Sequence, residues 1–112
     1  MAKGELPTAK ERRDMLAQDS PALGETGRAL ATAGRWGEAL ECLDAAGDQE
    51  GLASAAAAAA ESGDLFLYRR AKQLLGQDLA PRDLASLAEA AEMAGKLSHA
   101  TAARKILHQE ES

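Results

Sequence analysis

Three glycines divide the chain at similar intervals, and they constrain its fold more than any other feature. Each glycine is followed by one polar residue and then by a large apolar one, as in Gly34-Arg35-Trp36, Gly63-Asp64-Leu65 and Gly95-Lys96-Leu97. Glycine commonly ends a helix, because it readily adopts the left-handed conformation found after a helix C-terminus. The spacings of 29 and 32 residues, with room for two helices in each, are typical of a helical repeat protein.

Capping residues between these glycines predict seven short helices. Thr8 and Glu11 form a capping box for a first helix from Thr8 to about Gln18. A second begins with Ser20 as cap and Pro21 in its first position, and it ends at Gly34. The others are expected at 36–46, at 49–62 after Asp48, at 64–75, from Pro81 to Gly95, and from Leu97 to about His108.

The composition excludes a sheet and a membrane span. The chain has 27 Ala and 16 Leu, one Ile and no Val. Ala and Leu are strong helix formers, whereas strands are built from β-branched and aromatic residues. The longest apolar run, Ala55 to Ala60, is far shorter than the roughly 20 residues that a bilayer requires. An all-α protein is therefore expected.

The net charge and the single cysteine limit the kinds of partner and the cellular compartment that we expect. The formal net charge is −5, and no basic patch of the kind that nucleic acid requires is present. Cys42 cannot form an internal disulfide, which suits a reducing compartment. The first residues lack the apolar core of a signal peptide. We expect a cytoplasmic protein that binds neither nucleic acid nor membrane.

The first helix pair resembles a tetratricopeptide repeat. Large and small residues fall at the spacings that this family uses, on Leu23, Gly27, Leu30, Ala39, Leu43 and Ala46, with Gly34 and Trp36 in the turn between the helices. The resemblance covers about residues 20–108. Tyr68 departs from it, because the family has a small residue at that position, and Arg104 stands where a large apolar residue would pack on a following repeat.

The resemblance implies a right-handed stack of three antiparallel helical hairpins. Residues 1–19 would form an N-terminal tail and a capping helix, and residues 109–112 a C-terminal tail. The hairpins would span about 20–48, 49–80 and 81–108. The spacing of small and large residues has a physical reason. Gly27 and Ala39 would let the paired helices approach closely, while Leu30 and Leu43 fill the gap between them.

The resemblance also implies a concave groove for a peptide or helix of another protein. The first helices of successive hairpins would line it, and their small side chains would let a partner backbone approach, while carboxylates would favour a basic partner. The predicted groove residues are Arg28, Thr32, Glu50, Ala53, Ala57, Glu61, Arg82, Glu89, Glu92 and Met93, with Ala60 and Ala85 between them. High helix propensity alone is the alternative explanation for the alanine run.

No residue pattern indicates catalysis, a metal site or a cofactor. His99 and His108 are nine positions apart on one helix and face opposite ways, so both are interpreted as solvated surface residues. Glu61, Glu89 and Glu92 are interpreted as solvated carboxylates, Arg69-Arg70 as a solvated face, and Cys42 as a half-buried, inert thiol. Trp36 and Phe66 are expected to pack between helices.

The expected function is that of a small, non-enzymatic protein–protein interaction module. A fold of this class does not specify its partner. Two alternatives remain open. One is a self-assembling scaffold such as a homodimer, and the other is an accessory or regulatory subunit of an enzyme or a secretion complex, with a site around Glu61, Glu89 and Glu92 that is completed by its partner.

Overall fold

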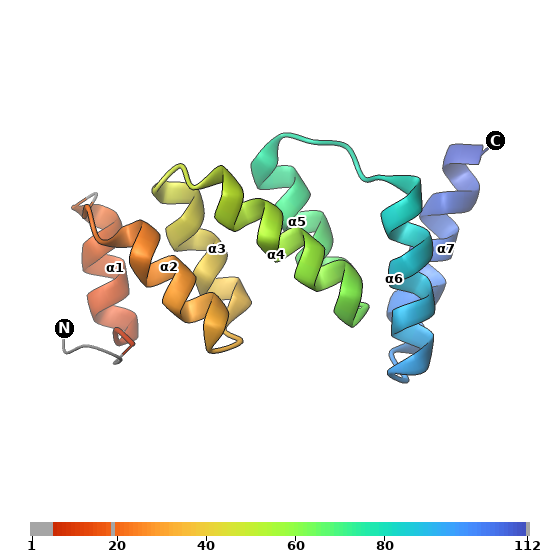
Figure 1. Ribbon diagram of the computed structural model, residues 1–112, viewed down its shortest axis with the longest axis horizontal. Helices are drawn as coiled ribbons and strands as arrows, with labels where there is room; N and C mark the ends of the chain where they lie inside the picture. The colour runs from red at the N-terminus through yellow and green to blue at the C-terminus, as the bar shows by residue number, and fades with distance from the viewer. Residues whose placement is uncertain (1–5, 19, 112) are drawn as a thin grey trace. The chain divides into compact units, whose positions relative to one another are not determined.

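The computed structural model describes residues 6–18 and 20–111, with side chains up to residue 109. These residues form seven α-helices and no strand (Figure 1). The helices are α1 (Ala9–Ala17), α2 (Leu23–Thr32), α3 (Trp36–Ala45), α4 (Gln49–Ser62), α5 (Leu65–Leu75), α6 (Pro81–Met93) and α7 (Leu97–Glu111). The all-α prediction is confirmed. Of the expected N-terminal part, residues 1–5 and 19 lie outside the described residues, as does residue 112 of the expected C-terminal tail. Residues 109–111 of that tail belong to α7, which is longer than expected.

The local sequence signals place most helix boundaries correctly. The Thr8–Glu11 capping box is formed, and the Asp64 side chain accepts a hydrogen bond from the amide of Leu67 at 3.1 Å. The start of α2 differs from the prediction, because Ser20 and Pro21 precede the helix and its first residue is Leu23. Ser20 Oγ accepts from the amide of Ala22 at 3.2 Å, so this hydroxyl stabilises the turn before the helix.

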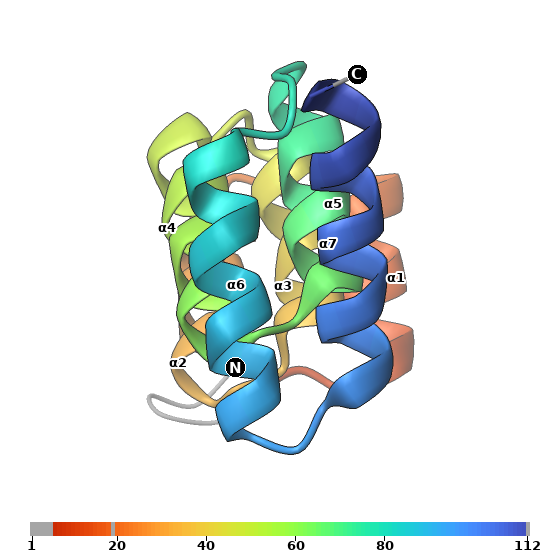
Figure 2. The ribbon, with the colours of Figure 1, turned by 90° about the vertical axis from the view of Figure 1, so that its right-hand side faces the viewer.

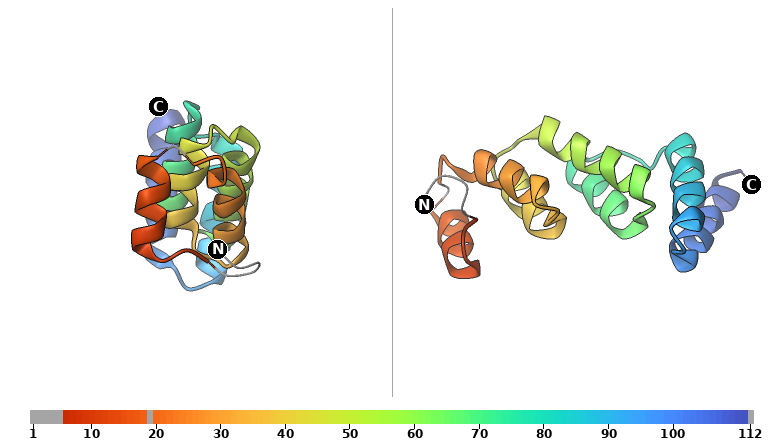
Figure 3. Two further views of the ribbon diagram at one scale, coloured as in Figure 1. Left: turned by 90° about the vertical axis from the view of Figure 1, so that its left-hand side faces the viewer. Right: turned by 60° about the horizontal axis from the view of Figure 1, so that its bottom comes forward.

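The chain divides into two compact units, one ending at Leu52 and the other beginning at Ala53. In the first unit α2 packs against α3 (Figure 3). A Cβ atom on Gly27 would lie only 2.9 Å from Leu43 Cγ, and both Ala39 and Leu30 are fully buried. The expected close approach of these two helices is confirmed.

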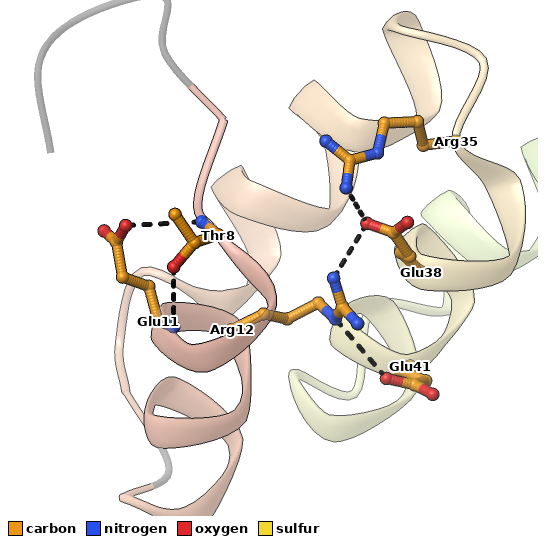
Figure 4. Close-up of polar contacts among 6 residues, drawn as sticks. All are labelled: Thr8, Glu11, Arg12, Arg35, Glu38 and Glu41. Atoms are coloured by element: carbon orange, nitrogen blue, oxygen red, sulfur yellow. Dashed lines mark hydrogen bonds and ion pairs between the residues drawn. The ribbon is translucent and has the colours of Figure 1, made fainter.

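Arg12 of helix α1 forms ion pairs with α3. None of its residues is fully buried. Arg12 Nη1 donates to Glu38 Oε2 at 2.8 Å, its Nε lies 3.6 Å from Glu41 Oε2, and Arg35 also donates to Glu38 (Figure 4). The Arg12 side chain is only 17 % exposed, and its stem thus covers apolar surface while its guanidinium bridges the two helices.

In the second unit α7 packs against both α5 and α6 (Figure 2). The turn between α4 and α5 approaches α6 very closely, because a Cβ on Gly63 would lie 2.5 Å from Ala91 Cα. Two hydrogen bonds attach this turn to α7. Lys96 Nζ donates to the carbonyl of Ser62 at 2.9 Å, and the amide of Leu65 donates to His99 Nδ1 at 3.0 Å.

The same burial pattern recurs in three helices. Four positions with the spacing i, i+3, i+4, i+7 are buried in each of α2, α4 and α6, 29 and then 32 residues apart in the chain. They are Leu23, Thr26, Gly27 and Leu30, then Leu52, Ala55, Ala56 and Ala59, then Leu84, Leu87, Ala88 and Ala91. This spacing is that of one helical face. The core is therefore built from a repeated stripe of small and medium-sized side chains.

Tyr68 departs from the family pattern but is accommodated in the core. It is 1 % exposed, at the position that corresponds to Ala39 and Ala100. Its hydroxyl donates to Asp83 Oδ2 at 2.9 Å and accepts from the amide of Ala80 at 3.1 Å. Ala80 is the N-cap of α6 and has no side-chain cap of its own, so Tyr68 binds the beginning of that helix.

Candidate functional site

The second unit contains an open groove between α4 and α6, with a volume of about 480 Å³. We name it the α4–α6 groove. Its wall is mostly apolar, with Ala57, Ala60, Ala90 and Met93, and three carboxylates and a hydroxyl stand among these residues, from Glu61, Asp83, Glu89 and Ser86. An apolar wall with a few polar groups is the usual composition of a binding site.

Periodicity places these residues on facing sides of the two helices. Ala60 and Glu61 lie three and four positions after Ala57 in α4, and Ser86 and Ala90 lie three and seven positions after Asp83 in α6. Side chains with this spacing share one helix face. The next positions of α6, Leu84, Leu87 and Ala91, are turned by about 100° from these and are fully buried, so the groove and the core use different sides of the same helix.

Four of the ten predicted groove residues line this groove: Ala57, Glu61, Glu89 and Met93. Arg82, Glu92 and Ala53 are exposed in the same unit but do not line it. Arg28, Thr32 and Glu50 belong to the first unit, where all three are exposed. Asp83, Ser86 and Ala90 were missed, although their spacing from Met93 could have identified them.

Arg28 forms an ion pair within the first unit. Its Nε and Nη2 donate to Asp48 Oδ2 and Oδ1 at 2.8 and 2.9 Å. The hydrogen bond from Arg28, followed by one from the amide of Gly51, lowers the pKa of Asp48, and the carboxylate in turn raises the pKa of Arg28. Glu50 lies 3.9 Å from the same guanidinium. Thr32 Oγ1 donates to the carbonyl of Arg28 at 3.0 Å.

Glu92 is likewise paired. Arg104 of α7 donates to it, and this hydrogen bond lowers the pKa of Glu92 and raises that of Arg104. Of the three glutamates singled out in the sequence, Glu61 and Glu89 therefore share the groove, whereas Glu92 holds α7 to α6.

His99 is not the solvated residue that was expected. It is half-buried, its Nδ1 accepts from the first amide of α5, and its ring meets that of Phe66 edge-on with the centroids 4.9 Å apart. An imidazole from a distant helix here satisfies one of the amides that lack a partner at a helix N-terminus. His108 is exposed.

The other singled-out side chains are placed as follows. Cys42 is fully rather than half buried, and desolvation raises the pKa of its thiol, which disfavours the reactive thiolate. Trp36 is half-buried, whereas Phe66 is 70 % exposed despite its contact with His99. The expectation that Phe66 is buried between helices is therefore wrong for most of its ring.

A second hollow, of about 700 Å³, lies beside the connection from α5 to α6. Arg69, Gln73, Gln77, Asp78 and Leu79 line it. Its residues are mostly polar and are spread over one helix and an extended connection.

Among residues 6–18 and 20–111, no three His, Cys, Asp or Glu side chains are grouped so that they could hold a metal ion. None of the described helices combines the length and the apolar character needed to cross a bilayer.

Comparison with known proteins adds no relative to this description. The chain matches no protein-family model, no curated protein and no solved structure.

Proposed function

We propose that this chain is a small, non-enzymatic protein–protein interaction module built from tetratricopeptide-like helical hairpins. It binds a helix or peptide that carries basic residues, and the α4–α6 groove receives this partner. The observation that carries the proposal is the combination of apolar wall and carboxylates in that groove.

The repeated burial stripe supports the hairpin architecture. The positions in α2, α4 and α6 that are buried recur at intervals of 29 and 32 residues, close to the family's period of about 34. The two hydrogen bonds between the α4–α5 turn and α7 each join residues 34 positions apart. Such contacts arise when neighbouring hairpins lie side by side in a stack.

The groove's side chains support a helical or extended partner. The side chains of Ala57, Ala60 and Ala90 in the groove wall are small, so a partner backbone can approach closely. Met93 is 90 % exposed at the end of α6, and its flexible, polarizable side chain can adapt to an apolar partner residue. Together these residues provide apolar surface that water covers in the unbound state.

The charges of the groove support a basic partner. Glu61, Asp83 and Glu89 all lie at the groove, and no cationic side chain among the described residues lines it. Charge complementarity across an interface favours the correct partner and speeds association. We therefore expect lysine or arginine in the bound segment.

The experiment measures binding of a fluorescently labelled amphipathic peptide of alanine, leucine and lysine by anisotropy. Glu61→Lys/Glu89→Lys should weaken binding by about tenfold or more, since about 1.4 kcal/mol corresponds to a factor of ten and two favourable charge contacts become repulsive. A peptide with glutamate in place of lysine should not bind the unaltered protein.

The control variant is Asp14→Lys/Asp44→Lys. It makes the same change in net charge at exposed positions of α1 and α3, and it should bind the lysine peptide as the unaltered protein does. Equal weakening by both variants would show that only net charge matters. Equal binding by the unaltered protein and Glu61→Lys/Glu89→Lys would show that the α4–α6 groove is not the binding site.

A further inference from the structure

Helix α5 lies on the other side of the second unit from α4 and α6 (Figure 2), and one of its faces forms an exposed ridge. The ridge consists of Phe66, Arg69, Arg70 and Gln73, all exposed. These positions are separated by three, four and seven residues from Phe66, which places them on one face of the helix. An aromatic ring and two guanidinium groups thus project from a single helix face.

Within the unit, the Phe66 ring contacts that of His99 edge-on, and this contact leaves most of the Phe66 side chain uncovered. The Phe66 side chain is 70 % exposed, although phenylalanine is among the residues most often buried. Among the described residues, no carboxylate forms an ion pair within 4.0 Å with Arg69 or Arg70. The ridge therefore has both apolar and charged groups available for a partner.

The α4–α6 groove has the complementary properties. Ala57, Ala60, Ala90 and Met93 supply apolar surface, against which an aromatic ring can pack, with the thioether of Met93 as a favourable neighbour. Glu61 and Glu89 likewise form no ion pair within 4.0 Å in the described part of the chain. Carboxylates bind guanidinium groups through short, paired hydrogen bonds.

We infer that the α5 ridge of one copy of this chain docks in the α4–α6 groove of a second copy. The inference rests on the proposed function, because it uses the same groove and names its basic helical occupant. Charge complementarity carries it, since one unit bears both the acidic groove and the basic ridge.

The positions of the two surfaces determine the kind of assembly. The groove lies between α4 and α6 whereas the ridge lies on α5, so the contact is heterologous and each bound copy leaves one ridge and one groove open. Contacts of this kind produce rings or open chains rather than twofold dimers. Assembly should also weaken with added salt, because the charges are solvent-exposed in the free protein.

The experiment is analytical ultracentrifugation of the full chain over a wide range of concentrations. The unaltered protein should show a weight-average mass that rises with concentration beyond that of a dimer. Arg69→Glu/Arg70→Glu and Glu61→Lys/Glu89→Lys should each remain monomeric. A mixture of these two variants should associate again, because the reversed ridge complements the reversed groove and each variant keeps one unaltered surface.

The control is Lys10→Glu/Arg13→Glu, which reverses two exposed cations of α1 and should leave association unchanged. Circular dichroism confirms that each variant is folded. A monomeric unaltered protein at every concentration, or a mixture that stays monomeric, would overturn the inference. If the lysine peptide still binds the groove in that case, the proposed function stands. If neither self-association nor peptide binding is observed, both proposals are wrong.

Discussion

Tyr68 and Gly63 each make a close contact with α6 in the second unit. Tyr68 occupies a core position that is alanine in the two corresponding helices, and it uses the extra length to reach Asp83 and the Ala80 amide. Gly63 has φ of +75° and approaches Ala91 too closely for a side chain. Both residues lie near connections between helices, where packing and backbone conformation must agree.

Tyr68→Phe should lower the free energy of unfolding by about 1–2 kcal/mol, because it leaves the Ala80 amide without its acceptor while conserving the ring. Urea unfolding followed by circular dichroism measures this change. Asp83→Ala and the double variant complete a cycle, in which the two losses should be less than additive. Full additivity would mean that the hydroxyl and the carboxylate do not interact in solution.

Gly63→Ala should be more destabilising than Gly95→Ala, although both glycines have φ of +75°. At Gly95 an added Cβ meets no atom within 4 Å, so only the left-handed conformation is penalised, by about 1–2 kcal/mol. At Gly63 the Cβ would also lie 2.5 Å from Ala91 N. Thermal unfolding of the two variants measures the difference, and equal melting temperatures would contradict the close approach of the turn to α6.

At the scale of the helix, the start of α4 combines a cap with an ion pair. Asp48 Oδ1 accepts from the amide of Gly51 at 3.0 Å, and both carboxylate oxygens accept from Arg28 of α2. The same side chain therefore satisfies an amide at the beginning of one helix and joins it to another. By contrast, α1 is joined to α3 through the Arg12 contacts, without a fully buried residue.

Asp48→Ala should lower stability by about 1 kcal/mol through the lost cap, and Asp48→Asn should lower it less, because an amide oxygen still caps the helix. The pKa of Asp48 is lowered in the folded state. Its ionic contribution is therefore complete above the ordinary aspartate value, about 3.9, and is lost as the pH falls from there through the lowered value.

The measurement is urea unfolding of the unaltered protein and both variants at neutral pH and at several pH values below 5. The unaltered protein should lose more stability on acidification than Asp48→Asn, which has no carboxylate at this position. Parallel pH profiles for the two proteins would indicate that the Arg28–Asp48 contact contributes nothing in solution.

At the scale of the whole molecule, α4 is the helix that contributes to both compact units, since their division falls between Leu52 and Ala53. Because α4 runs without a break from Gln49 to Ser62 and helix formation is cooperative along one helix, we expect α4 to couple the unfolding of the two units.

Ala53→Pro should separate their unfolding. Ala53 is exposed, so the substitution acts on the backbone, where proline removes a hydrogen bond and disrupts the helix at a cost of about 3 kcal/mol. Calorimetry should show one transition for the unaltered protein and two for the variant. Ala53→Ser, which keeps the hydrogen bond, should retain one transition. A single transition in the proline variant would mean that α4 is not the element that couples the units.

Four of the ten predicted groove residues line the α4–α6 groove, so the sequence located part of this groove but not the rotation of α6. Ala57, Glu61, Glu89 and Met93 were placed in the groove from the spacing of first helices in a repeat, and they do line it. On α6 the expected face included Arg82, whereas the groove uses Asp83. A shift of one position rotates a helix face by about 100°, and only packing against the neighbouring helices determines that rotation.

Most helix boundaries follow from the local sequence, because caps such as Thr8, Asp48 and Asp64 and the glycines that follow helices act within a few residues of themselves; the start of α2 at Leu23 is an exception. The polar side chains that form hydrogen bonds between helices are set by the tertiary structure instead. Arg28 meets Asp48, Glu92 meets Arg104, and His99 meets the first amide of α5. These partners are distant in the chain, and a hydrogen bond forms only where folding brings donor and acceptor within about 3 Å.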